Sequence, residues 1–153
     1  MSYLLDTGIL LRLVDKQARS HQLVSTAIGL RGNRGENLVI TTQNAAEFCN
    51  VATRPIANNG LGLAPADALD LLAREIDPIS LVLAEPDVLY GEMKRLIAKY
   101  GVSGKQVHDA RLVAMMLVWK IENVLTLNDR DFRRYEPEGI MIVTPTSIAH
   151  SSP

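Results

Sequence analysis

Short apolar runs alternate with segments of helical periodicity along this chain. The runs are rich in branched residues and do not alternate with polar positions, which is typical of strands buried on both faces of a sheet. Five runs predict strands, at Tyr3–Leu5, Leu38–Thr41, Ile79–Leu83, Val124–Thr126 and Ile140–Val143.

Between these runs, apolar residues recur at the spacing of one helix face. The stripes are formed by Leu69, Leu72, Ala73 and Ile76, by Leu89, Met93, Leu96 and Tyr100, and by Leu112, Val113, Met116 and Leu117. Pro65 and Pro86 occupy positions suited to a first helical turn, and Ser103 with Gln106 has the spacing of a capping box. Strands that alternate with helices predict an α/β fold with a mainly parallel sheet flanked by helices.

The length and composition fit one domain. The chain has 153 residues, 47% of them hydrophobic, and can bury roughly two-thirds of its unfolded surface. The Pro/Gly/Asn-rich segment Pro55–Pro65 is too short for a domain boundary. We therefore expect a single domain over residues 1–149 and a frayed tail at 150–153.

Charge and cysteine content exclude several classes of protein. The 16 basic and 17 acidic residues give a net charge of −1, so a nucleic acid would have to bind at a local patch. The single cysteine, Cys49, allows no internal disulfide and fits a reducing cytosol. No signal peptide is recognisable, and no apolar run approaches the roughly 20 residues that span a membrane. We expect a cytoplasmic protein.

The segment Asp6-Thr7-Gly8 has the form of the catalytic motif of aspartic proteases. Those enzymes are all-β and need two such aspartates side by side. Here an amphipathic segment follows, with Ile9 and Leu13 at helical spacing, and no second Asp-Thr-Gly occurs in the sequence. The pattern therefore disfavours a protease.

Acidic residues gather at one predicted edge of the sheet. In a parallel α/β sheet, ligands bind beyond the carboxyl ends of the strands. Asp6 follows the first strand, Glu47 lies in the helix after the second, and Asp131 follows the fourth. Asp109 stands near the start of the helix that leads into the fourth strand. Four distant segments thus deliver carboxylates to one edge.

Each acid also has a purely structural explanation. Asp6 could cap the first helix, Asn128 and Asp131 could form a cap and its first-turn acid, and Glu47 could be solvated. Asp109 is harder to explain, because it shares an apolar stripe of its helix. A carboxylate there is costly unless a cation or hydrogen-bond donors compensate it.

The convergence of these acids favours a metal site. Two carboxylates about 4 Å apart repel by roughly 4 kcal/mol at an effective dielectric constant near 20, so several together imply a cation or raised pKa values. No cluster of Cys and His indicates zinc, whereas all-oxygen ligands suit Mg²⁺ or Mn²⁺. Such an ion suits phosphodiester hydrolysis, because it can activate the attacking water and neutralise charge on the phosphate.

These residues give the chain a resemblance to the PIN-domain ribonucleases, and in particular to the VapC-like toxins of bacterial toxin–antitoxin pairs. The resemblance rests on the order and spacing of the segments LLDTGILLRL, NAAEFCNVATRPIANNGLGL, HDARLVAMM and VLTLNDRDF. It implies an acidic catalytic site with polar support, formed by Asp6, Glu47, Asp109 and Asp131 with Thr126 and Asn128. Gly8 departs from the family pattern, which commonly has Asn or Ser there.

The same resemblance implies a PIN-like three-layer domain with a five-stranded parallel sheet, Mg²⁺- or Mn²⁺-dependent cleavage of RNA, a homodimer and a small antitoxin partner. We expect Asp6 and Asp109 to bind the metal directly, while Glu47 and Asp131 complete the pocket directly or through waters. RNA phosphates would contact basic residues that flank the acidic segments, with Arg12, Arg54 and Arg130 as candidates.

Two other functions stay open. A receiver-like signalling domain also carries clustered aspartates and Mg²⁺, but it needs an Asp after the third strand and a Lys after the fifth. The segments ISLVLAEP and MIVTPTS supply neither. A catalytically silent PIN scaffold, acting through protein contacts, is opposed by the intact acidic set.

Overall fold

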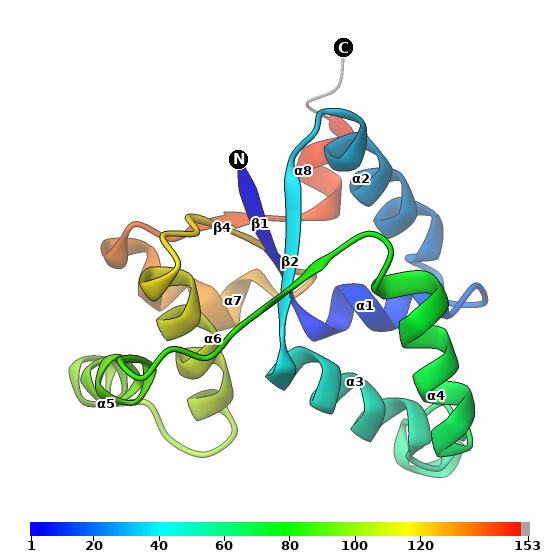
Figure 1. Ribbon diagram of the computed structural model, residues 1–153, viewed down its shortest axis with the longest axis horizontal. Coiled ribbons are helices and arrows are strands. Elements are labelled where there is room, and N and C mark those ends of the chain that lie inside the picture. Colours follow the sequence, from blue (N-terminus) through cyan, green and yellow to red (C-terminus); the bar gives the residue numbers. More distant parts are fainter. Residues whose placement is uncertain (151–153) are drawn as a thin grey trace.

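A five-stranded sheet in the order β3-β2-β1-β4-β5 divides the molecule into two helical layers (Figure 1). The computed structural model describes residues 1–150. Every strand pair is parallel, which confirms the predicted three-layer α/β architecture. The strands are β1 (Ser2–Leu5), β2 (Asn37–Thr41), β3 (Leu81–Leu83), β4 (Asn123–Leu125) and β5 (Met141–Val143).

Each face of the sheet carries its own hydrophobic cluster. The first cluster packs one set of helices against Leu5 and Ile40. This set comprises α1 (Thr7–Val14), α2 (His21–Asn33), α3 (Thr42–Thr53), α4 (Pro65–Leu71), the π-helical turn η2 (Leu72–Ile76) and α8 (Pro145–His150). The second cluster packs the remaining helices against Leu4 and Val39. They are α5 (Leu89–Tyr100), α6 (Gln106–Val118), α7 (Asp129–Phe132) and the 3₁₀-helix η3 (Arg133–Glu138).

The predicted strands all form, with ends shifted by one or two residues. The expectation that both faces of every strand are buried is wrong at the edges of the sheet. Leu81 and Val82 in β3 are exposed, as is Met141 in β5, because an edge strand has one neighbour and less helical cover. The central strand β1 is buried from Tyr3 to Leu5.

The predicted helical stripes lie in helices, but the first stripe is partly wrong. Leu69 and Ala73 are exposed, and Ala68 is buried instead. The π-helical turn that starts at Leu72 changes the residue spacing, so the face that packs on the sheet shifts at this point. Pro65 is the first residue of α4, as predicted.

The predicted starts of the next two helices need correction. Helix α6 begins at Gln106 without a side-chain cap, so the capping box at Ser103 is wrong. Gly104 has a φ of +59° there, which breaks the helical path that a capping box needs. Helix α5 begins at Leu89, three residues after Pro86. No predicted stripe covers α2, whose buried residues Val24, Ala27 and Ile28 form only a short one.

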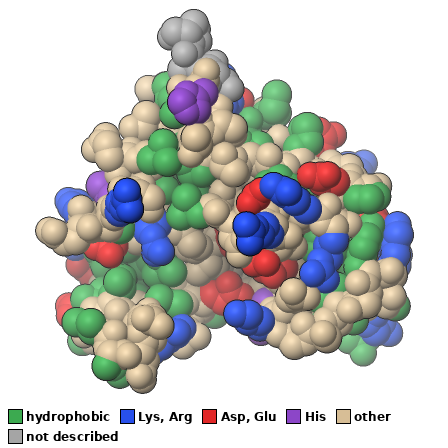
Figure 2. Space-filling view, turned by 180° about the vertical axis from the view of Figure 1, so that it is seen from behind, with side chains coloured by type: hydrophobic (Ala, Val, Ile, Leu, Met, Phe, Trp, Pro, Cys, Tyr) green, Lys and Arg blue, Asp and Glu red, His purple; other side chains and the backbone are tan. Residues whose placement is uncertain are grey.

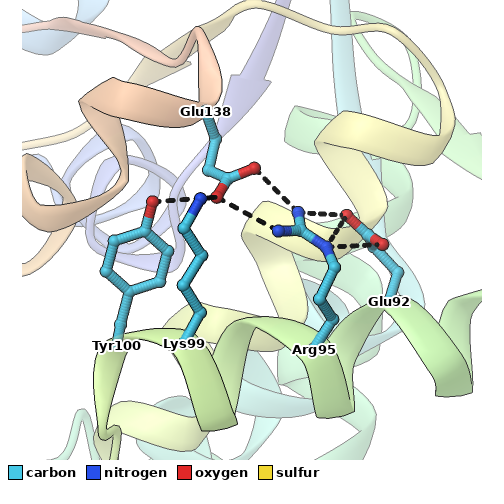
Figure 3. A network of polar contacts seen from close by, with 5 residues as sticks. All are labelled: Glu92, Arg95, Lys99, Tyr100 and Glu138. Carbon is cyan, nitrogen blue, oxygen red and sulfur yellow. Dashed lines mark hydrogen bonds and ion pairs between the residues drawn. The ribbon is translucent and has the colours of Figure 1, made fainter.

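Helix α5 is tied to η3 by a network of charged side chains around Glu138 (Figure 3). Glu138 accepts hydrogen bonds from Arg95 at 2.7 Å, Lys99 at 2.6 Å and Tyr100 at 2.8 Å. Arg95 also pairs with Glu92. These contacts hold the pKa of Glu138 at about 2, below its usual range, chiefly through the hydrogen bonds from Arg95 and Lys99.

The last described helix extends further than expected. His150, assigned above to a frayed tail, is the final residue of α8, and the rest of that predicted tail lies outside the described residues. Within residues 1–150, no helix is long and apolar enough to cross a membrane.

Candidate active site

The carboxyl ends of the strands converge on one side of the domain, where several helices begin. Asp6 follows β1 and is the N-cap residue of α1. Thr41 ends β2 and starts α3 through a capping box with Asn44, which places Glu47 on the second turn of that helix. Asp109 lies near the start of α6. Asp131 lies in the short helix α7 after β4.

Asp6 is both a helix cap and a member of the acidic group. Its Oδ1 accepts a 2.8 Å hydrogen bond from the Thr7 backbone N–H, and its Oδ2 accepts a 2.7 Å bond from Thr126 Oγ1. Burial raises the pKa of Asp6, the two hydrogen bonds oppose that shift, and the charges of Glu47 and Asp131 add to it. Asp6 therefore caps α1 and also lies within electrostatic range of two other acids of the predicted site.

Glu47 is held by a donor on each oxygen. Thr7 Oγ1 donates to Oε2 at 2.8 Å, and Gln43 Nε2 donates to Oε1 at 2.8 Å. Asn44 Nδ2 in turn donates to Thr7 Oγ1 at 3.3 Å. The side chain of Glu47 is thus fixed in position rather than freely solvated.

Asp109 is an acid whose titration is strongly shifted. Among residues 1–150, no group donates a hydrogen bond to its carboxylate. Burial raises the pKa of Asp109 to about 7, and the charges of Asp131, Asp6 and Glu47 contribute, while Arg134 opposes the shift. The negative charges of three other segments therefore act on this one carboxylate.

Thr126 and Asn128, the predicted polar support, each donate a hydrogen bond to one of the four acids. Asn128 precedes α7 but does not cap it with its side chain. Instead, its Nδ2 donates to Asp131 Oδ2, and its backbone N–H donates to Thr126 Oγ1 at 2.9 Å. Thr126 thereby connects Asp6 to the segment that carries Asp131.

An open hollow of about 860 Å³ lies between α3 and the start of α6. It is lined by Glu47 and Asp131, and an adjoining recess is lined by Asp109 as well. Figure 2 shows this indentation at the lower centre, with acidic side chains inside it and basic ones beside it. A Cβ at Gly8 would meet no atom within 4 Å, so this departure from the family pattern leaves open space at the hollow.

The donor set fits a divalent cation. Oxygen ligands from carboxylates suit Mg²⁺ or Mn²⁺. A cation would compensate the buried charge of Asp109 and its repulsion by the other acids, which together raise the pKa of this residue. Within residues 1–150, however, no three acidic, His or Cys groups lie close enough to hold one ion together. The arrangement therefore fits an ion bound by one or two carboxylates, which reaches the others through water.

The three basic candidates, Arg12, Arg54 and Arg130, lie in different places. Arg54 lines the hollow, together with Lys105, another of the basic residues that flank the acidic segments. Arg12 lines a different hollow, beside Asp15 and Arg19, so the structure does not bring it to the acids. Arg130 is exposed on α7.

Sequence patterns missed the polar residues that hold the acids. Thr7, Gln43 and Asn44 are all buried and bond to the acidic group or to one another. Their signal was available, because Gln43 and Glu47 are four residues apart in a predicted helix and so share a face.

Comparison with known proteins agrees with this architecture. The sequence profile of the PIN domain matches residues 3–137, and no curated protein matches the chain. The strand order also differs from the 2-1-3-4-5 order of receiver-like domains, and a parallel sheet excludes the aspartic protease fold.

Several solved structures have a similar fold. DNA-bound VapBC from Salmonella typhimurium has a TM-score of 0.69 at 17% identity, over 95% of this chain and 98% of that one. VapBC2 from Rickettsia felis, bound to a promoter DNA fragment, has a TM-score of 0.67 at 15% identity, over 94% and 98%. VapC20 from Mycobacterium tuberculosis, a toxin that cleaves the sarcin–ricin loop, has a TM-score of 0.63 at 13% identity, over 91% and 96%. At these identities the likeness is one of fold.

Proposed function

Because the chain belongs to the PIN domain family, we propose that it is a metal-dependent endoribonuclease and the toxin of a toxin–antitoxin pair. The observation that carries this proposal is that Glu47, Asp109 and Asp131 line one recess, and that burial together with the charges of Asp131, Asp6 and Glu47 raises the pKa of Asp109. A structural role for each acid alone does not explain why the charges of the other three act on Asp109.

Each acid has a place in the proposed chemistry. Asp6 and Asp109 bind Mg²⁺ or Mn²⁺ directly, and Glu47 and Asp131 reach the ion directly or through water. When bound, such an ion lowers the pKa of a water molecule and neutralises charge that develops on the phosphate. Thr126, Asn128 and the donors to Glu47 keep the carboxylates oriented while the phosphodiester is hydrolysed.

Basic residues at the rim hold the RNA backbone. Arg54 and Lys105 line the acidic hollow and can bind phosphates on either side of the scissile bond. Without them, an RNA would meet a negatively charged opening.

The partners follow from the same premise. The structures of similar fold include DNA-bound VapBC complexes. We propose that the present chain also binds a small antitoxin. We further propose that it forms a homodimer, in which each subunit contributes one nuclease domain, residues 1–149. An antitoxin segment could place an Arg or Lys among the carboxylates and replace the charge of the metal.

The test of this function is RNA cleavage by the purified protein with Mg²⁺, with Mn²⁺ and with EDTA. We expect endonucleolytic products with 5′-phosphates in the presence of either ion and none in EDTA. Intact RNA under every condition, from folded protein freed of any co-purified partner, would favour a silent scaffold. Co-expression with the product of the adjacent reading frame, followed by light scattering, tests the antitoxin and the homodimer separately.

A further inference from the structure

Gln43 makes hydrogen bonds with every polar atom of its side chain. This residue is 7% exposed on α3. Its Nε2 donates to Glu47 Oε1 at 2.8 Å and to the backbone carbonyl of His108 at 2.9 Å, and its Oε1 accepts from Arg111 Nη1 at 2.7 Å. One amide therefore contacts an acid of the site on its own helix and two residues of α6.

The sense of this amide is fixed by its partners. Arg111 can only donate, whereas the Glu47 carboxylate and the His108 carbonyl can only accept. A flipped amide would set donor against donor at Arg111 and acceptor against acceptor at Glu47. Arg111 is itself held by an ion pair with Glu85.

A second contact closes a ring between the two helices. Thr42 Oγ1, at the start of α3, donates to Glu85 Oε1 at 2.8 Å. The polar connection thus runs from α3 through Gln43 to α6, and returns through Arg111 and Glu85 to α3. Both ends of the connection lie next to acids, because Glu47 is one helical turn from Gln43 and Asp109 directly follows His108.

The hydrophobic cores do not provide this link. Phe48 and Ala52 of α3 belong to the first cluster, whereas the buried residues of α6 belong to the second. Figure 1 shows α3 and α6 on opposite sides of the sheet. The contacts that join α3 to α6 beside Glu47 and Asp109 are therefore polar, with no shared apolar packing between the buried residues of the two helices.

We infer that Gln43 is a positioning residue, which fixes Glu47 relative to Asp109 so that the two carboxylates can share one divalent ion. Arg111 acts through Gln43 by setting the orientation of its amide. The expected effect of Gln43 on RNA cleavage rests on the proposed function, whereas its effect on metal binding can be measured without RNA.

The test compares Mn²⁺ affinity, RNA cleavage and melting temperature for the parent and single variants. Gln43→Met keeps the length of the side chain and removes all three hydrogen bonds. We expect it to weaken Mn²⁺ binding by roughly tenfold or more, the usual effect of losing a group that orients a metal ligand. Arg111→Met, a change at a half-buried residue, should weaken Mn²⁺ binding less, and the double variant should match Gln43→Met alone.

Gln22→Met is the matched control. Gln22 is exposed on α2 and bonds only to Thr26 among the described residues, so its replacement should leave Mn²⁺ affinity unchanged. A Gln43→Met protein that melts earlier but binds Mn²⁺ as the parent does would overturn the inference and leave Gln43 a structural residue.

The two proposals fail in different ways. If the parent binds Mn²⁺ but cleaves no RNA, the proposed function falls, while loss of Mn²⁺ affinity in Gln43→Met still supports the positioning role. If the parent cleaves RNA and Gln43→Met binds Mn²⁺ and cleaves equally well, the function stands and the positioning role is wrong. A parent that binds no Mn²⁺ overturns both.

Discussion

Thr126 Oγ1 donates a 2.7 Å hydrogen bond to Asp6 Oδ2, which joins the ends of β1 and β4 at the acidic hollow. The same hydroxyl accepts from the backbone N–H of Asn128. Asp6 is thus held on one oxygen by a side chain 120 residues away and on the other by the helix that it caps. Its orientation is fixed even though burial and nearby charges disfavour its ionised form.

Asp6→Asn should stabilise the metal-free protein by about 1 kcal/mol, because it removes a poorly solvated charge that two other carboxylates repel. An Asn side chain can still cap α1. Urea unfolding in EDTA measures this change. In Mn²⁺ at 100 times its dissociation constant, the parent should gain about 2.7 kcal/mol and the variant much less. An equal gain in both proteins would count against Asp6 as a metal ligand.

Asp109 should make the stability of the metal-free protein decrease as the pH rises from about 4 to about 7. The pKa of Asp109 is about 7 in the folded protein and ordinarily 3.8. In this window the folded state therefore holds a proton that the unfolded state has released, and stability is lost as that proton leaves. The contribution should be roughly 1–2 kcal/mol after solvent screening.

Unfolding in EDTA across this pH range measures the contribution of Asp109. Asp109→Asn should flatten the corresponding part of the profile. A variant profile with the same slope as the parent would show that Asp109 titrates normally.

Glu138 should affect stability in the opposite direction and at lower pH. Its folded pKa of about 2 lies below its ordinary 4.5, so its contribution is present above pH 4.5 and is lost as the pH falls towards 2. Glu138→Gln should destabilise the protein by about 1–2 kcal/mol at neutral pH and leave Mn²⁺ affinity unchanged. Asp70→Asn, in an exposed pair with Arg74, should cost no more than about 0.5 kcal/mol. Equal effects of the two changes would argue against a stabilising network at Glu138.

Arg54 and Lys105 should contribute to RNA binding more than Arg12. Binding can be followed by fluorescence anisotropy at several salt concentrations, in an Asp109→Asn background that prevents cleavage. Arg54→Gln or Lys105→Gln should each weaken binding and lower the salt slope by about 0.7, the value for one phosphate contact with a single strand. Arg12→Gln should change neither, because Arg12 lines a separate hollow. A larger effect at Arg12 would place the RNA on a different surface.

The sequence predicted the layers and the acids because both depend on local patterns. Buried strands such as Tyr3–Leu5 are visible in the sequence as apolar segments. The carboxyl ends of parallel strands lie at one edge of the sheet, so Asp6 after β1 and Asp131 after β4 were expected at the same edge. The exposure of Leu81 and Val82 in β3 could not be predicted from their residue types, because both residues are apolar. Their exposure depends on the position of the strand at the edge of the sheet, which is a property of the assembled fold.

The support of the acids was harder to predict for a similar reason. Thr7 beside Asp6 and Gln43 beside Glu47 look like ordinary helix-start residues until α1 and α3 are packed together. The bond from Gln43 to the carbonyl of His108 spans 65 residues and follows no sequence pattern. The predicted capping box at Ser103 does not form for a local reason. Gly104 takes a left-handed conformation, which the spacing of Ser103 and Gln106 alone does not reveal.

The most direct test of the proposed active site is Mg²⁺-dependent RNA cleavage by charge-removing variants of the four acids. Asp6→Asn, Glu47→Gln, Asp109→Asn and Asp131→Asn should each reduce cleavage sharply, and combinations should lose little more than single changes, because one missing ligand already disables the metal site. Asp67→Asn and Asp77→Asn, at exposed positions, should cleave as the parent does. RNA cleavage by Asp109→Asn at the parental rate would contradict the assignment of this site, even with the fold unchanged.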